Sequence, residues 1–401
     1  MRKIFSSLLT IAAVFGVMSC QKNADAPELQ GPQPDCRLIV RIGTENTTKA
    51  GFVTENTIDK HINSLQIFVF DAESKLETDY WKSFSSPQAG EASVEIATFR
   101  GAKTVYAVVN RPRLVLPKEF TLANFESELT TQYGATAAST ILSDLSENTY
   151  GTETTNLVMV GKNTIEMAEY NRNVNAPTAS VQAAQTLNIF VKRLAALVKL
   201  EKITVNFDNT SLEDATFTIK GIYLRNVVGK SRMGLSGVTA SAAADVYPLA
   251  LDGAVQNAWW YNRAKLSDNK GPAASWEDFT LGDINVHGTA KTVNHCLLAY
   301  PNKETTDSND ASFGPRFTRL VIHANIQKPG IIADEADGEC WYTFDLPSGL
   351  KANNIYKIEN ITISLFGANV DDDSLNDDPG RLVPTVTVDN WANGATLNYY
   401  L

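Results

Sequence analysis

The stretch Cys36-Arg37-Leu38-Ile39-Val40-Arg41-Ile42 decides how this chain is interpreted. Every second side chain from Cys36 to Ile42 is small or apolar, and two of the three side chains between them are arginines. Because successive side chains of a strand point to opposite faces, this alternation predicts a half-buried β-strand. The polar run from Gly43 to Lys49 then separates the strand from the rest of the chain.

An apolar leader precedes this strand. Residues 1–19 combine a positively charged start with an apolar run, Leu8 to Val17, that is too short to span a bilayer as a mature helix. We therefore interpret residues 1–19 as a signal peptide. The leader ends in Val17-Met18-Ser19-Cys20, which looks like a bacterial lipobox, in which Cys20 receives the lipid and becomes the mature N-terminus.

The composition is that of a globular, strand-rich protein. The 401 residues are 43% hydrophobic and 20% charged, a length and balance that favour two domains. Short β-branched and aromatic runs, such as Leu65 to Phe70 and Thr104 to Val109, lie between turn-forming residues and predict a mainly β protein. The net charge is −10 and no polybasic tract occurs, so nucleic acid is not an expected partner.

Further strands and a few short helices are expected along the chain. The spacing of apolar residues between Phe120 and Leu145 favours one or two short helices in a loop. The run Leu187 to Leu200 fits both helix and strand patterns, and we interpret it as extended structure passing from one domain to the next. The other predicted strands are Ala92–Ile96, Leu157–Gly161, Ile203–Phe207, Thr216–Ile219, Ile222–Leu224, Cys296–Tyr300, Phe317–Ile326, Trp341–Leu346 and Ile355–Phe366.

The C-terminal tail alternates in the same way as the first strand. One alternating segment contains Val386 and Val388, and a second contains Leu397, Tyr399 and Leu401. Chain ends usually fray unless they are tied down. An alternating apolar terminus is therefore expected to complete a sheet.

Cysteine numbers leave two alternatives for one pair. Apart from Cys20, the chain contains Cys36, Cys296 and Cys340. An odd number is unusual for an exported protein, but Cys36 would leave with any segment that is removed up to Lys49. Cys296 and Cys340 then either form a disulfide or remain two buried thiols.

The sequence shows no pattern typical of a catalytic, cofactor or metal site. The acidic run from Asp371 to Asp378 lacks the ligand spacing of an EF-hand and is interpreted as a solvated loop. The pair His295-Cys296 has no partner pair at zinc-binding spacing, and no glycine-rich phosphate loop occurs. We expect no metal, no cofactor and no enzyme activity. The aromatic run Trp259-Trp260-Tyr261 is either packed internally or a surface that stacks on carbohydrate.

The order of these features resembles the FimA-type major fimbrial subunits of Bacteroidetes, which assemble type V pili. The resemblance covers nearly the whole chain. The matching features are Cys20, Leu38–Ile42, Lys49-Ala50-Gly51-Phe52, Ile62–Asp71, Val105–Asn110, Arg193–Val198, Asn354–Ile358, Gly367, and Val386–Val388 with Trp391.

The resemblance implies two transthyretin-like β-sandwich domains in tandem, with few short helices in loops. It divides the chain into a signal peptide (1–19), a lipidated propeptide with a removable first strand (20–49), an N-terminal sandwich (50–199), a C-terminal sandwich (200–382) and a donor-strand segment (383–401).

It also implies a way to polymerise. A trypsin-like surface protease would cut between Lys49 and Ala50 and remove the strand that carries Leu38, Val40 and Ile42. The tail of another subunit would then fill the vacated groove. The best-known family members are cut after Arg, whereas Lys49 stands at the matching position here. Exposed polar segments such as this one are favoured sites of proteolysis.

The expected partners follow from this role. They are identical subunits in a head-to-tail polymer, fimbrial anchor and tip subunits, the processing protease, and the outer membrane through the lipid before cleavage. The expected location is the outer membrane for the precursor and the cell-surface fimbria afterwards. The alternative role is a tip adhesin or a glycan-binding surface lipoprotein.

Overall fold

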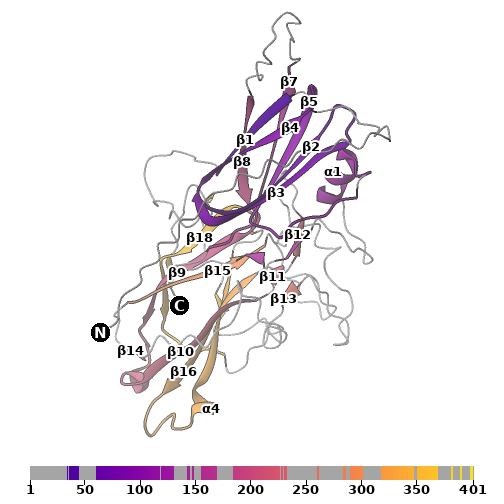
Figure 1. Ribbon diagram of the computed structural model, residues 1–401. Coiled ribbons are helices and arrows are strands. Elements are labelled where there is room, and N and C mark those ends of the chain that lie inside the picture. The colour runs from indigo at the N-terminus through magenta and orange to yellow at the C-terminus, as the bar shows by residue number, and fades with distance from the viewer. Residues whose placement is uncertain are drawn as a thin grey trace, which may run out of the picture. The chain divides into compact units, whose positions relative to one another are not determined.

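The computed structural model confirms a mainly β protein (Figure 1). Two short α-helices occur among the described residues, α1 (Leu122–Thr130) and α4 (Glu335–Gly338), and a 3₁₀ turn spans Thr210–Leu212. The structure describes residues 34, 36–44, 60–117, 119–130, 142–144, 147–148, 155–168, 184–225, 227–228, 230–232, 260–261, 283–285, 290–300, 318–346, 350–368, 381–382, 389–390 and 398–400.

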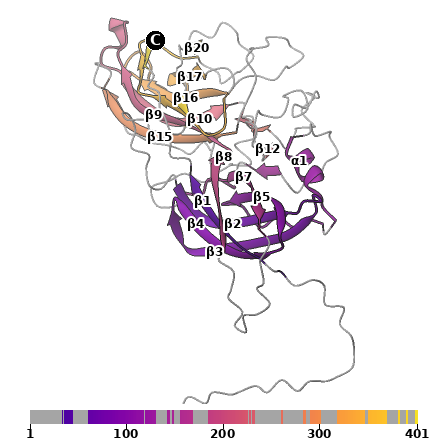
Figure 2. The ribbon, with the colours of Figure 1, turned by 90° about the horizontal axis from the view of Figure 1, so that it is seen from above.

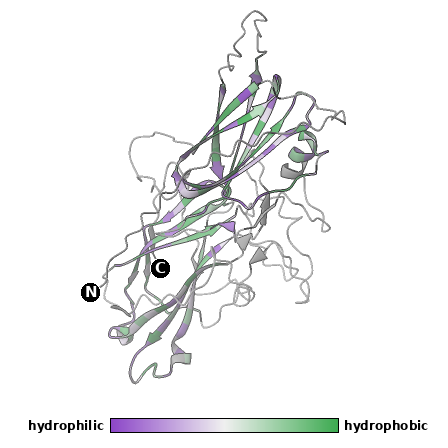
Figure 3. Ribbon diagram, viewed as in Figure 1, coloured by the Kyte–Doolittle hydropathy of each residue, from purple (hydrophilic) through white to green (hydrophobic). Residues whose placement is uncertain are grey.

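Seven strands in the first half of the chain form one sheet with the order β3-β2-β5-β7-β8-β1-β4. The strands are β1 (Cys36–Thr44), β2 (His61–Phe70), β3 (Leu76–Ala89), β4 (Glu91–Thr98), β5 (Gly101–Val109), β7 (Met159–Met167) and β8 (Gln185–Arg193). Hydrophobic and hydrophilic residues alternate along several of them (Figure 3). This period of two predicts one buried and one exposed face, and β4 follows it at every residue.

This sheet folds into two layers at the junction of β7 and β8. The two strands pair only at Met159 with Arg193 and at Val160 with Lys192. The next residue, Gly161, lies so close to β8 that an added Cβ would be 2.5 Å from the carbonyl oxygen of Phe190. The layer β8-β1-β4 therefore packs over the layer β3-β2-β5-β7, and a hydrophobic core fills the space between them.

The outer side of the four-stranded layer is covered by helix α1. Phe125 of α1 is fully buried against three aromatic rings, with centroid distances of 5.3 Å to Phe68, 5.4 Å to Phe70 and 4.9 Å to Tyr106. Glu126 on the same helix accepts a hydrogen bond from the Tyr106 hydroxyl. The helix expected between residues 120 and 145 is thus present at 122–130, and its apolar side docks on the sheet.

The second half of the chain contains two larger sheets that share one hydrophobic core. One has the order β14-β10-β16-β17-β20. In the other, β9 pairs with β15 on one edge and with β18 and β19 on the other. The strands are β9 (Ala196–Val205), β10 (Thr216–Arg225), β14 (Asp283–Asn285), β15 (Lys291–Ala299), β16 (Arg319–Gln327), β17 (Glu339–Asp345), β18 (Asn354–Ile358), β19 (Asn360–Ile363) and β20 (Arg381–Leu382).

Several strands of two or three residues are also present. Two segments of the tail, β21 (Asp389–Asn390) and β22 (Asn398–Tyr400), pair with β18 and β19 respectively. The remaining pairs are β6 (Leu142–Asp144) with β12 (Lys230–Arg232), and β11 (Val227–Val228) with β13 (Trp260–Tyr261). The run Leu187 to Leu200 is extended, as expected, and forms β8 and most of β9. The predicted domain boundary after residue 199 therefore falls within β9. No helix in the described part of the chain has the length and apolarity needed to span a membrane.

Candidate functional site: the groove that holds the first strand

The first strand is buried along one face over its whole length. Its exposure alternates at every residue from Cys36 to Thr44. Leu38 and Val40 are 0% exposed and Ile42 is 1% exposed, so all three side chains that were predicted to be buried lie in the core. A strand that contributes three fully buried aliphatic side chains is an integral part of this sandwich.

β1 lies between two partners that run in opposite directions (Figure 2). It pairs in parallel with β8, from Leu38 opposite Gln185 to Thr44 opposite Val191. It pairs antiparallel with β4, from Cys36 opposite Thr98 to Gly43 opposite Glu91. Both edges of β1 are thus used, and the strand holds the three-stranded layer together.

The core face of β1 belongs to a hydrophobic cluster that has buried members from every other strand of the sandwich except β3. Tyr80 and Phe84 of β3 are partly buried and pack against this cluster. Aliphatic side chains make up most of the lining, and two methionines complete it. The buried members of the cluster outside β1 are Ile62, Leu65, Ile67, Val69, Ala92, Val94, Ile96, Val105, Ala107, Val109, Met159, Met167, Leu187, Ile189 and Val191. Without β1 this surface is an apolar groove that is one strand wide.

The outer face of β1 is polar and loosely held. Arg37 donates to Glu95 of β4 over 2.9 Å, and both side chains are about half exposed. Such an exposed ion pair contributes roughly 0–1 kcal/mol. Phe190 of β8 is 59% exposed and lies over Gly43. The interactions that keep β1 in the sheet are therefore mainly those of its buried face and its two hydrogen-bonded edges.

A buried ion pair lies beside the start of β1. The carboxylate of Glu77 in β3 accepts a hydrogen bond from the ammonium group of Lys103 in β5 over 2.6 Å. Its other oxygen accepts from the hydroxyl of Thr98 and, over 3.1 Å, from the backbone N–H of Phe99. Glu77 thus joins the four-stranded layer to the end of β4.

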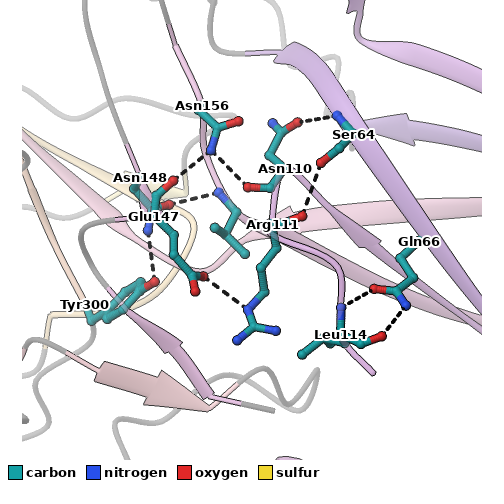
Figure 4. Close-up of polar contacts among 10 residues, drawn as sticks. Ser64, Gln66, Asn110, Arg111, Leu114, Glu147, Asn148, Asn156 and Tyr300 are labelled. Carbon is teal, nitrogen blue, oxygen red and sulfur yellow. Dashed lines mark hydrogen bonds and ion pairs between the residues drawn. The ribbon is translucent and has the colours of Figure 1, made fainter. Parts of the chain in front are cut away.

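A network of amide side chains holds the loops at the start of β2 and the end of β5 (Figure 4). Asn110 has a left-handed backbone (φ 61°) and accepts from the backbone N–H of Asn63 over 2.6 Å. It donates to the carbonyl oxygens of His61 (2.7 Å) and Leu157 (3.0 Å). Asn156 donates to the Asn110 carbonyl over 2.9 Å. These bonds satisfy backbone groups that the strands leave without partners.

The same network reaches the second half of the chain. The side chain of Asn148, which is fully buried, donates to the hydroxyl of Tyr300 over 2.9 Å and accepts from the N–H of Val158 over 2.8 Å. Arg111 pairs with Glu147 over 3.1 Å. Sequence reasoning did not find this network, because its members are far apart in the chain and asparagines are common in loops. It contains donors and acceptors that position backbone, so we assign it a structural role.

The two cysteines of the possible pair lie in different sheets. The structure has no disulfide between Cys296 and Cys340, and their pairing stays a prediction. Cys296 is in β15, which pairs with β9, whereas Cys340 is in β17, which pairs with β16. Burial raises the pKa of the Cys340 thiol to about 12. A thiol that stays protonated in the core is a poor nucleophile for disulfide formation.

Most of the other predicted sites lie outside the described residues. These are Cys20, Lys49, Ala50, Val386, Val388, Leu397 and Leu401. Tyr399 is in β22, opposite Ile361. Of the aromatic run, Trp260 and Tyr261 form β13, and Trp259 is not described. Within the described residues, no cluster of three or more His, Cys, Asp or Glu side chains could hold a metal ion.

Comparisons with known proteins agree with this geometry. Residues 37–207, which begin in β1 and end just after β9, match the sequence model of the family "Major fimbrial subunit protein (FimA)". A search among curated protein sequences gives no match.

Solved structures from Bacteroidetes share the fold. The chain aligns with a fimbrilin (FimA) from Porphyromonas gingivalis W83 with a TM-score of 0.52 and 13% identity, covering 92% of this chain and 98% of that one. A candidate cell adhesion protein from Bacteroides eggerthii DSM 20697 gives a TM-score of 0.53 and 17% identity, with 92% and 99% covered. A second candidate cell adhesion protein, from Parabacteroides distasonis ATCC 8503, aligns with a TM-score of 0.52 and 16% identity, covering 90% of this chain and 98% of that one.

The family match includes the buried first strand, and the fold match extends through the second half of the chain. The predicted β-sandwich fold is confirmed, since the structure is mainly β and aligns with solved fimbrilin over most of both chains. The resemblance to FimA-type major fimbrial subunits is therefore confirmed: residues 37–207 match the sequence model of that family, and the chain shares its fold with solved fimbrilin.

Proposed function

We propose that this protein is a non-enzymatic shaft subunit of a cell-surface fimbria that polymerises by donor-strand exchange. The observation that supports this most directly is the position of β1. It is a buried, centrally placed strand, yet it precedes a polar segment with a basic residue, Lys49, that a trypsin-like protease could cut. A strand in this position can be removed without cutting any other strand of the sandwich.

The energetics favour replacement of β1 once it has left. Burial of each aliphatic side chain contributes about 1.5–3 kcal/mol, so Leu38, Val40 and Ile42 together contribute roughly 5–9 kcal/mol. This is comparable with the whole stability of a typical domain, about 5–15 kcal/mol. The facing edges of β8 and β4 would also lose their hydrogen-bond partner. An open groove of this kind therefore binds another strand or aggregates.

The tail of a second subunit is the proposed replacement strand. Its two alternating segments carry Val386 and Val388, and Leu397, Tyr399 and Leu401, with the same period of two as β1. The described parts of the tail pair with their own subunit over two residues in β21 and three in β22. Because donor and acceptor sites differ, the contact repeats head to tail and gives a filament.

Export and maturation complete the proposal. The precursor is carried to the outer membrane as a lipoprotein through Cys20, and a trypsin-like protease then cuts between Lys49 and Ala50. The mature subunit joins identical subunits, with anchor and tip subunits at the ends of the fimbria. The domain division at residues 50–199, 200–382 and 383–401 belongs to this proposal.

Controlled cleavage tests the mechanism. Purified precursor is treated with trypsin, and filaments are sought by negative-stain electron microscopy. We expect filaments from the wild type, none from Lys49→Ala, and none from a chain that ends before Val383. Cleavage products are identified by mass spectrometry. Filaments from both variants at the wild-type rate would refute the proposed mechanism.

A further inference from the structure

The strand β4 depends on β1 more than any other strand of the sandwich does. Among the described strands, β4 pairs with β1 alone, whereas β8 also pairs with β7. When β1 leaves, β4 has no neighbouring strand. The ion pair between Arg37 and Glu95 leaves with it, because Arg37 belongs to β1. A groove keeps its width only if something else holds β4 in place.

Two contacts at the ends of β4 do not involve β1. At its start, the N–H of Gly90 donates to the carbonyl oxygen of Lys60 over 3.0 Å. At its end, Glu77 accepts from the hydroxyl of Thr98 and the N–H of Phe99. The first contact lies beside a tight turn from β3. The second one joins β4 to the opposite layer of the sandwich.

Glu77 is well placed to act as a fixed anchor. Its side chain is 9% exposed and that of Lys103 is 2% exposed. A buried carboxylate costs free energy unless donors surround it, and here Lys103, Thr98 and the Phe99 N–H supply three hydrogen bonds. Lys103 is in β5 and Glu77 is in β3, so both remain in the four-stranded layer when β1 is removed.

We propose that Glu77, oriented by Lys103, is a positioning residue that holds the end of β4 in place while the groove is empty. This inference rests on the proposed strand exchange and names the residue that keeps the acceptor groove ready for its donor. With β4 held at both ends, the incoming strand meets two edges at the correct spacing. Without Glu77, the strand would first have to order β4, and its apparent affinity would fall by the fraction of chains in which β4 is in place.

Strand binding to the emptied groove tests this directly. The trypsin-cut protein is stripped of its first strand in urea by gel filtration and diluted into buffer that contains a fluorescent peptide of residues 36–44. Binding is measured by fluorescence anisotropy at several peptide concentrations. The variants are Glu77→Gln, which keeps the size but loses the charge that attracts Lys103, and Glu73→Gln, a matched control. Glu73 is exposed in the turn between β2 and β3, away from the register positions of β1.

We expect Glu77→Gln to weaken peptide binding at least about tenfold, because hydrogen bonds to a charged group are lost. Glu73→Gln should change it less than about twofold. If Glu77 only stabilises the fold, Glu77→Gln lowers the denaturation midpoint of the uncut precursor but leaves the peptide affinity unchanged, and the inference is wrong. Hydrogen exchange adds a second measure, since β4 amides of the empty variant should exchange faster than those of the empty wild type.

A milder variant covers the case in which Glu77→Gln does not fold. Thr98→Val keeps the shape of the side chain and the Lys103–Glu77 pair but removes the hydroxyl bond to β4. It should also weaken binding, and unchanged affinity would overturn the inference. Failure of the proposed function looks different. In that case the emptied wild-type protein binds neither the peptide nor its own tail, whatever stands at residue 77.

Discussion

Replacing Leu38 with alanine should weaken the precursor and leave the mature filament unchanged. Leu38 is fully buried in the core of the sandwich. Truncation of a buried leucine to alanine costs about 2–5 kcal/mol, because apolar contacts are lost and a cavity remains. That cost is a large part of the roughly 5–15 kcal/mol that stabilises a typical domain. For the release of β1 from the groove, this cost would raise the dissociation equilibrium constant by roughly 30- to 4000-fold.

The assay compares the same substitution before and after cleavage. Urea unfolding of the uncut protein, monitored by tryptophan fluorescence, measures how much the substitution lowers the free energy of unfolding of the precursor. The filaments formed after trypsin treatment are then dissociated in urea and followed by light scattering. Since β1 is absent from the mature subunit in the proposed mechanism, Leu38→Ala filaments should dissociate at the wild-type concentration. Release of β1 after cleavage should be faster, so filaments should also appear sooner.

Ile39→Ala on the same strand is the matched control. Ile39 lies on the outer face of β1 and is only partly buried. Its truncation should cost less than about 1 kcal/mol in the precursor. The reasoning fails if Leu38→Ala filaments dissociate at lower urea than wild-type filaments, because Leu38 would then still be in the groove of the mature subunit. It also fails if the two substitutions destabilise the precursor equally.

Four further predictions concern the fold. Because burial raises the pKa of Cys340 to about 12, iodoacetamide at about pH 8 should leave Cys340 unmodified and alkylate half-buried Cys296, as peptide mass spectrometry would show. The folded state disfavours the Cys340 thiolate, so the free energy of unfolding should fall as the pH rises above the ordinary thiol value of 9.0. Asn110→Ala should cost about 2–4 kcal/mol in urea unfolding, because it removes several hydrogen bonds at a left-handed residue. Gly161→Ala should lower the thermal midpoint by the equivalent of about 1–3 kcal/mol, whereas Gly43→Ala, whose new Cβ would have its nearest neighbour at 3.6 Å, should be tolerated.

Strands with a buried face could be predicted from the sequence, and the exposed edge strand could not. The alternation from Cys36 to Ile42 predicted β1, and Leu38, Val40 and Ile42 are buried as it indicated. The strand β3, Leu76–Ala89, was not predicted. It is an edge strand with mostly exposed or half-buried residues, so its sequence has no apolar period. Backbone hydrogen bonds to β2 define this strand, and such bonds do not require particular side chains.

The candidate site could be predicted only in part, for a related reason. The first strand is a local pattern, and its alternation can be seen directly in the sequence. The groove around it is built from strands spread between residues 62 and 191, and its lining follows only from their order in the sheet. The Glu77–Lys103 pair joins residues that are 26 positions apart in different strands. Nothing in either local sequence distinguishes these two charged residues from solvent-exposed ones.

The opposite directions of β8 and β4 have a consequence for the polarity of any strand that enters between them. A strand inserted in either direction is parallel to one neighbour and antiparallel to the other. Backbone hydrogen bonding therefore does not distinguish the two directions by type of ladder. The side chains must therefore determine the direction of insertion, because they fit the positions of Leu38, Val40 and Ile42 in one order only. The direction of growth of a polymer built on this groove would thus be encoded in the shapes of a few aliphatic pockets.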